Sequence, residues 1–352
     1  MATATITEHA QVHRGAAVLE QIAAWQAAIG PAEHPARDLR WLACLSRGLA
    51  HVPLVIVSQR DDRVAGILPL ALVASPLFGR FLVSLPYVNS AGPLTEDDEI
   101  ARQLIDRAVE LAGELNVRYL ELRNESAIEH AALTATNTSK VHMRLALPPT
   151  AEALLASFKS KLRSQLKGHQ KNDFQFAWGG SELLPEFYDV FSRNMRDLGT
   201  PVYPRQFFAA ILDEFAGQAE LCVSRLAGRA VAAALVVHGH GTSEVPSASS
   251  LRQFNGSGAN MVMYWQLLCR AIERGQSVFD FGRSTIGSGT FKFKEQWGAK
   301  PSPAVWQYHV RRGSATQMRP ESGKYGLAIR VWQRLPLWLA NLMGPAIVRG
   351  IP

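Results

Sequence analysis

The sequence has 352 residues, of which 47% are hydrophobic and 19% are charged, and its formal net charge is +7. This composition excludes a disordered or low-complexity chain, and it supplies enough apolar residues for one large core or two ordinary ones. The three cysteines are far apart and form no CxxC pair. They predict reduced thiols, a cytoplasmic protein and no metal site.

Several other classes of protein are also not expected. The first fifteen residues lack the apolar core of a signal peptide. No run of about twenty apolar residues occurs, so no transmembrane helix is predicted. The sequence has no GxSxG motif, no Walker loop and no metal-ligand spacing, which argues against a serine hydrolase or a P-loop nucleotidase.

Apolar periodicity predicts alternating helices and strands along the whole chain. In the first part, helices are expected over 17–29, 37–49 and 100–116, and strands over 53–58, 64–73, 81–87, 117–122 and 141–147. In the second part, helices are expected over 151–172, 185–198, 204–215 and 260–274, and strands over 219–226, 230–238, 242–249, 276–281 and 304–310.

The two parts resemble each other. PLVIVSQRDDRVAGILPLAL and ELCVSRLAGRAVAAALVV both read as strand, polar turn and strand, so residues 53–73 and 219–237 should form equivalent hairpins. The sequence therefore predicts an α+β protein with two mixed sheets flanked by helices and meeting along a cleft. We expect an N-terminal domain over 1–150, a C-terminal domain over 151–310 that carries the site, and a basic tail over 311–352 packed on the first domain.

The stretch FDFGRSTIGSGTFKFKEQW is the strongest candidate for a functional site. Asp280 and Arg283 follow its buried strand, and Lys292 and Lys294 stand at strand spacing after a glycine-rich loop. A carboxylate and several cations around such a loop suit an anionic or acyl-carrying substrate. Glu244, on the preceding strand, is a second possible general base. The alternative is an ion pair beside a solvated hairpin.

A second candidate is the loop Gln253-Phe254-Asn255-Gly256-Ser257-Gly258-Ala259, which follows a strand and opens a helix. Exposed N–H groups and the helix dipole at such a place can hold a phosphate, so Gln253, Gly256, Gly258 and Ala259 would bind the phosphate of a donor. The alternative is a glycine-rich turn that caps the helix. We expect Asp280, Arg283, Glu244 and Lys292 to line one pocket beside this loop.

Arg163 shares one helical face with Lys159 and Lys167, which could grip phosphates or could be a solvated face, and Tyr203 and Arg205 belong to a loop whose aromatic and Arg residues suit substrate recognition. Together with residues in or next to the two motifs above, these are the residues expected to bind substrate. They are Arg163, Tyr203, Arg205, Ser247, Arg252, Asn260, Lys292, Lys294 and Trp297.

Several segments together resemble the FemAB-like branch of the GNAT superfamily, among them KLRSQLK, NMRDLGTPVYP, EVPSASSLRQFN and DFGRSTIGSGTFKFKEQWGA. The chain is most similar to the FemAB-related family associated with the XrtA/PEP-CTERM exosortase system, which carries a BioF2-like acetyltransferase domain. The resemblance implies tandem GNAT domains. It also implies transfer of an acyl or aminoacyl group to an amine or hydroxyl of a cell-envelope or exopolysaccharide precursor.

The resemblance leaves the donor open among acyl-CoA, acyl carrier protein and aminoacyl-tRNA, and it implies neither a permanently bound cofactor nor a DNA partner. The long helical hairpin with which some FemAB ligases bind tRNA is missing from the sequence. No obligatory nucleophile is visible. The alternative is therefore a non-catalytic GNAT-fold protein that recognises an anionic saccharide precursor or a protein partner.

The tail combines basic residues, Arg319 and Lys324 among them, with one apolar helical stripe. The stripe consists of Leu327, Ala328, Val331, Trp332 and Leu335. This pattern is typical of a peripheral contact with the inner membrane, where a lipid-linked acceptor would be found. The alternative is that the stripe packs on the first domain.

Overall fold

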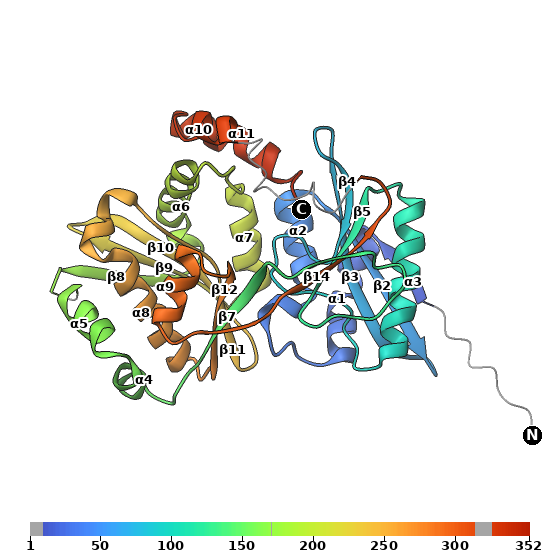
Figure 1. The fold of residues 1–352 in the computed structure, drawn as a ribbon, viewed down its shortest axis with the longest axis horizontal. Helices are drawn as coiled ribbons and strands as arrows, with labels where there is room; N and C mark the ends of the chain where they lie inside the picture. Colours follow the sequence, from blue (N-terminus) through green and yellow to red (C-terminus); the bar gives the residue numbers. More distant parts are fainter. Residues whose placement is uncertain (1–9, 170, 314–325) are drawn as a thin grey trace, which may run out of the picture.

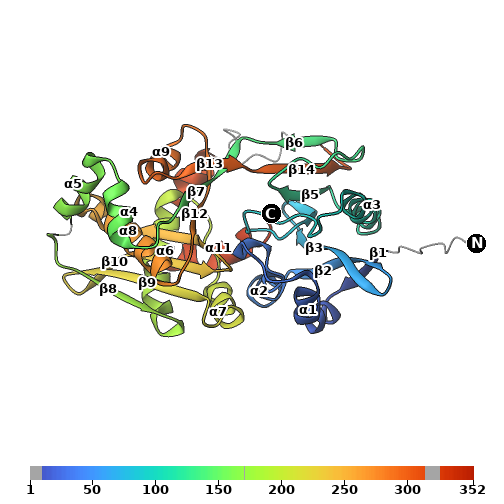
Figure 2. The ribbon, with the colours of Figure 1, turned by 90° about the horizontal axis from the view of Figure 1, so that it is seen from below.

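The computed structural model describes residues 10–169, 171–313 and 326–352. Arg319 and Lys324 of the predicted basic tail lie outside the described residues. Two seven-stranded sheets lie side by side, each with helices packed against it (Figures 1 and 2). This arrangement confirms the predicted α+β fold with two mixed sheets.

The first sheet contains, in spatial order, β1 (Ala10–Arg14), β2 (Val52–Arg60), β3 (Arg63–Ser75), β4 (Gly79–Val83), β5 (Tyr119–Asn124), β14 (Val305–Val310) and β6 (Ala135–Asn137). The second contains β8 (Phe174–Gly179), β9 (Ala219–Leu226), β10 (Arg229–His238), β11 (Thr242–Ser250), β12 (Val278–Thr285), β7 (Lys140–Ala146) and β13 (Lys300–Pro303).

The two sheets have the same order and the same polarity. In each, the neighbouring strands are antiparallel except for the fourth and fifth, which are the parallel pairs β4–β5 and β11–β12. The β2–β3 and β9–β10 hairpins occupy equivalent positions. The expected duplication is thus present in the topology as well as in the sequence.

The two halves exchange one strand, which the sequence did not predict. β7 comes from the first half of the chain but pairs with β12 and β13 in the second sheet. β14 comes from the second half but pairs with β5 and β6 in the first sheet. The expected boundary at residue 150 therefore divides the sequence but not the sheets, because each sheet is completed by a strand from the other half.

The helices of the first half are α1 (Ala16–Ile29), α2 (Trp41–Leu49) and α3 (Asp98–Glu114). Those of the second are α4 (Ala151–Ser157), α5 (Ser160–His169), α6 (Leu184–Leu198), α7 (Arg205–Glu214), α8 (Ala259–Glu273) and α9 (Gly289–Gln296). The tail forms α10 (Gly326–Trp332) and α11 (Leu337–Val348). The expected basic helix over 151–172 is split at Phe158, whose backbone is extended.

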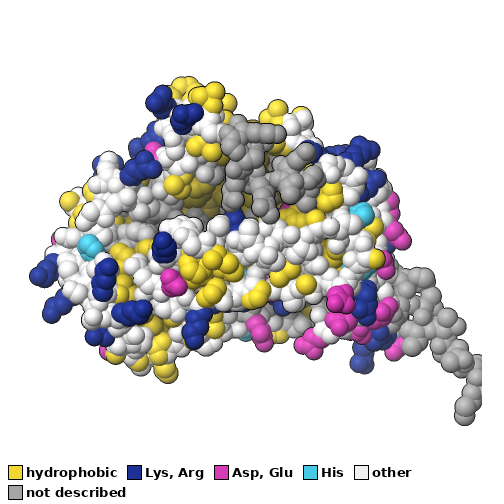
Figure 3. All heavy atoms as spheres, in the orientation of Figure 1, with side chains coloured by type: hydrophobic (Ala, Val, Ile, Leu, Met, Phe, Trp, Pro, Cys, Tyr) yellow, Lys and Arg dark blue, Asp and Glu magenta, His cyan; other side chains and the backbone are white. Residues whose placement is uncertain are grey.

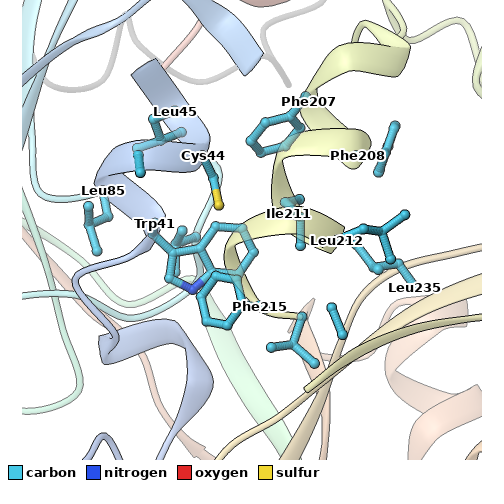
Figure 4. Close-up of a cluster of buried hydrophobic side chains, with 14 of the residues drawn as sticks. Trp41, Cys44, Leu45, Leu85, Phe207, Phe208, Ile211, Leu212, Phe215 and Leu235 are labelled. Carbon is cyan, nitrogen blue, oxygen red and sulfur yellow. The ribbon is translucent and has the colours of Figure 1, made fainter. Parts of the chain in front are cut away.

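One hydrophobic core runs across the junction of the two halves. Side chains of α2 and α7 interdigitate there, and the rings of Trp41 and Phe215 lie 5.2 Å apart (Figure 4). Gly48 lets the two helices approach, because a Cβ atom at this position would lie 2.5 Å from the Cα atom of Phe207. Burial of apolar side chains from both halves holds them in one arrangement.

The close approach of α2 and α7 yields a prediction about stability. Gly48→Ala should lower the free energy of unfolding by about 1–3 kcal/mol, because the added methyl group meets backbone that cannot move aside. The matched control is Gly113→Ala in α3, where nothing lies within 4 Å of the new Cβ. That change should raise stability by about 0.5–1 kcal/mol. Urea denaturation measures both, and equal shifts would contradict the packing of α2 on α7.

Candidate active site

The site lies where the parallel strands β11 and β12 separate. Their register contains only three pairs and ends with Glu244 opposite Asp280. Directly beyond, β11 has Pro246, which has no N–H for the ladder, and β12 has Gly282 at φ 74°. Both strands carry a register shift at this point. The local sequence therefore opens the sheet next to two buried carboxylates.

Asp280 is fully buried and is the centre of a network of charges. Its Oδ2 atom lies 2.9 Å from His34 Nε2 and accepts a hydrogen bond from Arg144 Nε at 2.8 Å, while Oδ1 accepts from the Gly282 N–H at 2.7 Å. Arg144 also binds Glu125 through two hydrogen bonds of 2.6 and 2.7 Å. Burial favours the neutral acid, but His34 and Arg144 outweigh it and hold the pKa of Asp280 well below its usual range.

Glu244 has the opposite environment. Its Oε1 atom accepts a hydrogen bond from Asn89 at 2.9 Å, whereas its buried Oε2 atom has no hydrogen-bond partner among the described residues. Burial raises the pKa of this carboxyl group, and the neighbouring charge of Asp280 adds to the rise. Two adjacent carboxyl groups whose pKa values move apart are typical of acid–base sites.

His34 connects the two carboxyl groups. Its Nδ1 atom accepts a hydrogen bond from the Ala36 N–H at 3.1 Å, so the geometry assigns the proton of the neutral ring to Nε2, which donates to Asp280. The same Nδ1 atom lies 4.0 Å from Glu244 Oε2. Burial lowers the pKa of His34, but the two carboxylates outweigh it and raise that pKa above its ordinary value. The charges of the two carboxylates thus favour the protonated form of His34, and the charge of His34 in turn opposes the rise in the pKa of Glu244.

Arg283 forms no ion pair with a described carboxylate. Its Nε atom donates to Asn89 Oδ1 at 3.1 Å, and its guanidinium carbon lies 3.5 Å from the ring centroid of Trp306. Burial and the nearby charge of Arg123 lower the pKa of Arg283 to about 9. In contrast, Arg123 also packs on Trp306 but is paired with Glu121 at 2.7 Å. Arg283 is therefore free to bind an anionic group of a substrate.

The expectation that Lys292 and Lys294 lie on a strand is wrong, because residues 289–296 form α9. Ser288 caps this helix and accepts a hydrogen bond from the Phe291 N–H. Lys292 is exposed. The buried amine of Lys294 donates to the carbonyls of Gly282 and Arg283, both at 3.0 Å. Burial lowers the pKa of Lys294 to about 8. This amine stabilises the irregular backbone of β12.

The glycine loop has the predicted setting between β11 and α8, but it does not lie beside the carboxylates. Glu244 is near the start of β11 and the loop follows its end, about 20 Å further along at the usual rise of a strand. Gly256 is open to solvent, whereas a Cβ atom on Gly258 would meet the ring of His169 in α5. Ala259 is buried and begins α8, whose first turn has no side-chain cap among the described residues.

The remaining predicted residues are distributed around this arrangement. Ser247 and Asn260 are partly buried on β11 and in the first turn of α8, and Arg252 and Gln253 are exposed in the loop between them. Tyr203 packs against Tyr87 with ring centroids 5.4 Å apart, and burial raises its pKa to about 12.

Three predicted residues have other surroundings. Arg205 is exposed at the start of α7. Arg163 donates to the carbonyls of Ala156 and Phe158 at the end of α4. Trp297 is fully buried and its ring lies 5.6 Å from that of Phe158, so it contributes to the core and does not contact a substrate.

Sequence reasoning missed His34, Asn89, Arg144 and Trp306. His34 lies between the two helices expected over 17–29 and 37–49, and nothing in its local sequence indicates a buried carboxylate partner. Arg144 gave a signal, because it is a charged residue inside an alternating strand. Its partner could not be predicted, since β7 was expected to belong to the first sheet.

A cavity of about 710 Å³ lies between α1 and α2 of the first half and α7 and β10 of the second. None of the predicted site residues lines it. Both arginines of its wall are already paired, Arg40 with Asp38 and Arg47 with Glu214. In the described parts of the chain, no group of three or more His, Cys, Asp or Glu side chains is placed to hold a metal ion.

Comparison with known proteins identifies the class of this fold. Residues 156–295 match the model of the acetyltransferase (GNAT) domain family, and this range contains β11, the glycine loop, α8 and β12. No curated protein matches the chain in sequence. The match and the topology together show a tandem GNAT-type fold, and the part that matches the domain model lies in its second half.

Solved structures agree with this class. The crystal structure of FemX is similar with a TM-score of 0.64 and 15% identity, over 90% of this chain and 100% of FemX. L-PGS from Bacillus licheniformis gives 0.57 and 14%, over 90% and 97%. A tandem GNAT protein from the clavulanic acid biosynthesis pathway gives 0.53 and 14%, over 86% and 100%. At these identities the similarity concerns the fold.

Because the two carboxyl groups have opposite environments, replacing each of them by an amide should have different effects on the free energy of unfolding. Asp280→Asn should cost about 3–5 kcal/mol of unfolding free energy at neutral pH, because it removes the buried carboxylate that pairs with both His34 and Arg144. Since the folded-state pKa of Asp280 is depressed, its contribution is present above about pH 4 and is lost as the pH falls through the folded-state pKa.

Glu244→Gln should leave stability unchanged or higher at neutral pH, because it removes a buried charge and keeps the acceptor for Asn89. The folded-state pKa of Glu244 is raised, so the wild-type protein loses stability as the pH rises above about 4.3, the ordinary pKa of the unfolded state. The difference in unfolding free energy between wild type and Glu244→Gln should therefore vanish in acid. Denaturation between acidic and neutral pH tests both variants. A large loss in Glu244→Gln would show that Glu244 is a structural anion.

Proposed function

We propose that the chain transfers an acyl or aminoacyl group to an amine or hydroxyl of a cell-envelope or exopolysaccharide precursor, and that the reaction takes place between Glu244 and Arg283. The observation that carries the proposal is the pair of adjacent buried carboxyl groups with opposite pKa shifts at the point where β11 and β12 separate. Such shifts are concentrated at functional sites, although structural ion pairs also produce them.

Glu244 is the general base in this proposal. The acceptor's amine or hydroxyl attacks the acyl carbonyl carbon, and its proton passes to the unpartnered Oε2 atom. The bond between the carbonyl carbon and the donor's sulfur then breaks, and the leaving thiolate receives that proton. A raised pKa suits this role, because it brings the carboxyl group closer to the pKa of the groups between which the proton moves.

Arg283 stabilises negative charge in the same step. Its guanidinium has no carboxylate partner in the described part of the chain and lies in a partly buried place, where a charge acts more strongly than in water. It would bind either the developing oxyanion or a phosphate of the acceptor. His34 and Asp280 set the pKa of Glu244 through their charges and do not need to touch the substrate.

The donor would extend along β11 from the glycine loop to Glu244. Beyond their three paired residues, the facing edges of β11 and β12 offer backbone groups to an extended chain with amide groups. The N-terminus of α8, with the open Gly256, would hold the donor's phosphate. GNAT domains use acyl-CoA as co-substrate, so acyl-CoA is our first choice, with acyl carrier protein and aminoacyl-tRNA as alternatives.

The nature of the acceptor rests on the sequence resemblance to FemAB-related proteins of exopolysaccharide loci. A sugar precursor linked to a nucleotide or a lipid carries phosphates, and Arg283 is a suitable partner for one of them. We therefore place the reaction in the cytoplasm, on a saccharide precursor of the XrtA/PEP-CTERM-associated kind.

The experiment offers the protein acetyl-CoA, acyl carrier protein loaded with an acyl group, and aminoacyl-tRNA, each with amino-sugar nucleotides, and detects products by mass spectrometry. Glu244→Gln should lower kcat for the productive pair by about 10²–10⁴-fold through loss of the general base. Arg283→Met should cause a loss of about 10²-fold or more. Glu295→Gln, on the exposed side of α9, should retain full activity.

Thermal unfolding of the same variants separates chemistry from folding, because neither Glu244→Gln nor Arg283→Met should lower the melting temperature. Full activity in both variants would show that the reaction does not take place at this junction. Binding of an amino-sugar nucleotide without transfer from any donor would instead support the non-catalytic alternative.

A further inference from the structure

The two tail helices expose large apolar side chains that the rest of the molecule does not cover. On α10, Leu327 is 69% and Val331 is 55% exposed. On α11, Trp338 is 68% and Leu342 is 70% exposed. Ile329 and Met343 add to this surface. The side chains of Leu327 and Val331 in the predicted stripe are thus largely in solvent and do not pack on the first domain.

The backbone of the tail is nevertheless anchored, mainly on the second half. Arg196 of α6 donates to the Leu335 carbonyl at 3.1 Å, and the side chain of Gln333 donates to the Asp197 carbonyl at 3.2 Å. At the end of α11 the tail reaches the first half, where Tyr87 donates to the Val348 carbonyl at 2.9 Å. The apolar side chains therefore project from a segment that is held in place.

The charge of this surface has one sign. Residues 326–352 contain three arginines and no aspartate or glutamate. Arg330, Arg334 and Arg349 are all exposed. Figure 3 shows apolar and basic side chains together at the top of the view, where α10 and α11 lie in Figure 1. Apolar side chains next to uncompensated cations complement a surface that has an anionic layer over a hydrocarbon layer.

A second element reaches the same side of the molecule. The turn between β3 and β4 carries Leu77, which is 78% exposed. The end of the tail packs against this turn, since a Cβ atom on Gly350 would lie 2.6 Å from Ser75 Oγ and 3.1 Å from Phe78. Figure 1 shows the β3–β4 turn and the tail helices at the top of the view. Both halves thus present apolar groups in one direction.

We propose that α10, α11 and the β3–β4 turn form a docking face for an anionic lipid bilayer. The helices would lie in the plane of the headgroups, because α11 has 12 residues and α10 has 7, whereas a span needs about 20. In agreement, none of the helices that the structure describes is sufficiently long and apolar for a span. Trp338, Leu342 and Leu327 would insert below the headgroups, and the arginines would bind lipid phosphates.

Docking in this orientation has a consequence for the active site. The tail end accepts a hydrogen bond from Tyr87, Tyr87 packs on Tyr203, and Arg123 and Arg283 are near enough to Tyr203 to oppose the rise of its pKa on burial. The bilayer would therefore lie on the side from which a lipid-linked acceptor could reach Arg283. This consequence rests on the proposed function, whereas bilayer binding itself does not.

The test is co-sedimentation of the full chain with vesicles of phosphatidylcholine alone and of phosphatidylcholine mixed with phosphatidylglycerol, at low and high salt. Wild type should bind the mixed vesicles and be released by salt. Arg330→Gln with Arg334→Gln should weaken binding about fivefold for each arginine removed. Trp338→Ser with Leu342→Ser should abolish it. All four side chains are exposed, so circular dichroism and the melting temperature should not change.

The controls alter similar residues elsewhere. Ile286→Ser replaces a side chain that is 61% exposed before α9, and Lys159→Gln with Lys161→Gln removes two exposed charges near and on α5. Neither should reduce vesicle binding by more than a small factor. Equal binding to neutral and anionic vesicles, or no binding to either, would overturn the proposal.

A dimer that sedimentation analysis detects in wild type and not in Trp338→Ser with Leu342→Ser would also overturn it, because the face would then bind a second copy of the chain. The transfer activity of Trp338→Ser with Leu342→Ser towards a water-soluble acceptor should equal that of wild type. Loss of vesicle binding with retained transfer thus distinguishes failure of docking from failure of the proposed function.

Discussion

The contact between Asp280, His34 and Arg144 is the interaction on which the arrangement of the two halves depends. His34 belongs to the first half, Asp280 lies on β12, and Arg144 lies on β7, the strand that the first half gives to the second sheet. Arg144 in turn binds Glu125, just beyond the end of β5. A fully buried carboxylate costs several kcal/mol unless it is paired, so the three elements must come together for the fold to be stable.

The pairing of Asp280 also determines the environment of Glu244, the proposed general base. Asp280 binds the nearby His34 and Arg144. Its neighbour across β11 and β12, Glu244, has one amide partner, an imidazole ring 4.0 Å away and one oxygen atom without a hydrogen-bond partner among the described residues. The ladder cannot continue past this pair, because Pro246 lacks an N–H and Gly282 adopts a positive φ. The separation of the strands, the raised pKa of Glu244 and the uncompensated Arg283 are therefore consequences of one short stretch of each strand.

Local patterns predicted the features that depend on nearby residues. The equivalent hairpins and the glycine loop before α8 follow from alternation and turn residues. Asp280 and Arg283 could be identified as charges at the end of a buried strand, and Glu244 as a carboxylate on the strand before it. The error at Lys292 and Lys294 was also local, since Ser288 is a helix cap that alternation over four residues concealed. The strand exchange could not be predicted, because β7 and β14 are compatible with either sheet. His34 and Asn89 depend on that long-range choice.

The central claim is that an acyl donor lies along β11 with its reactive carbon between Glu244 and Arg283. The most direct measurement is a crystal structure of the protein with a thioether analogue of acyl-CoA, in which sulfur is bonded to CH₂ so that transfer cannot occur. The account predicts the phosphates at the N-terminus of α8 and the sulfur within reach of Glu244 and Arg283. An analogue bound in the cavity between α1 and α7, with the junction unoccupied, would contradict it.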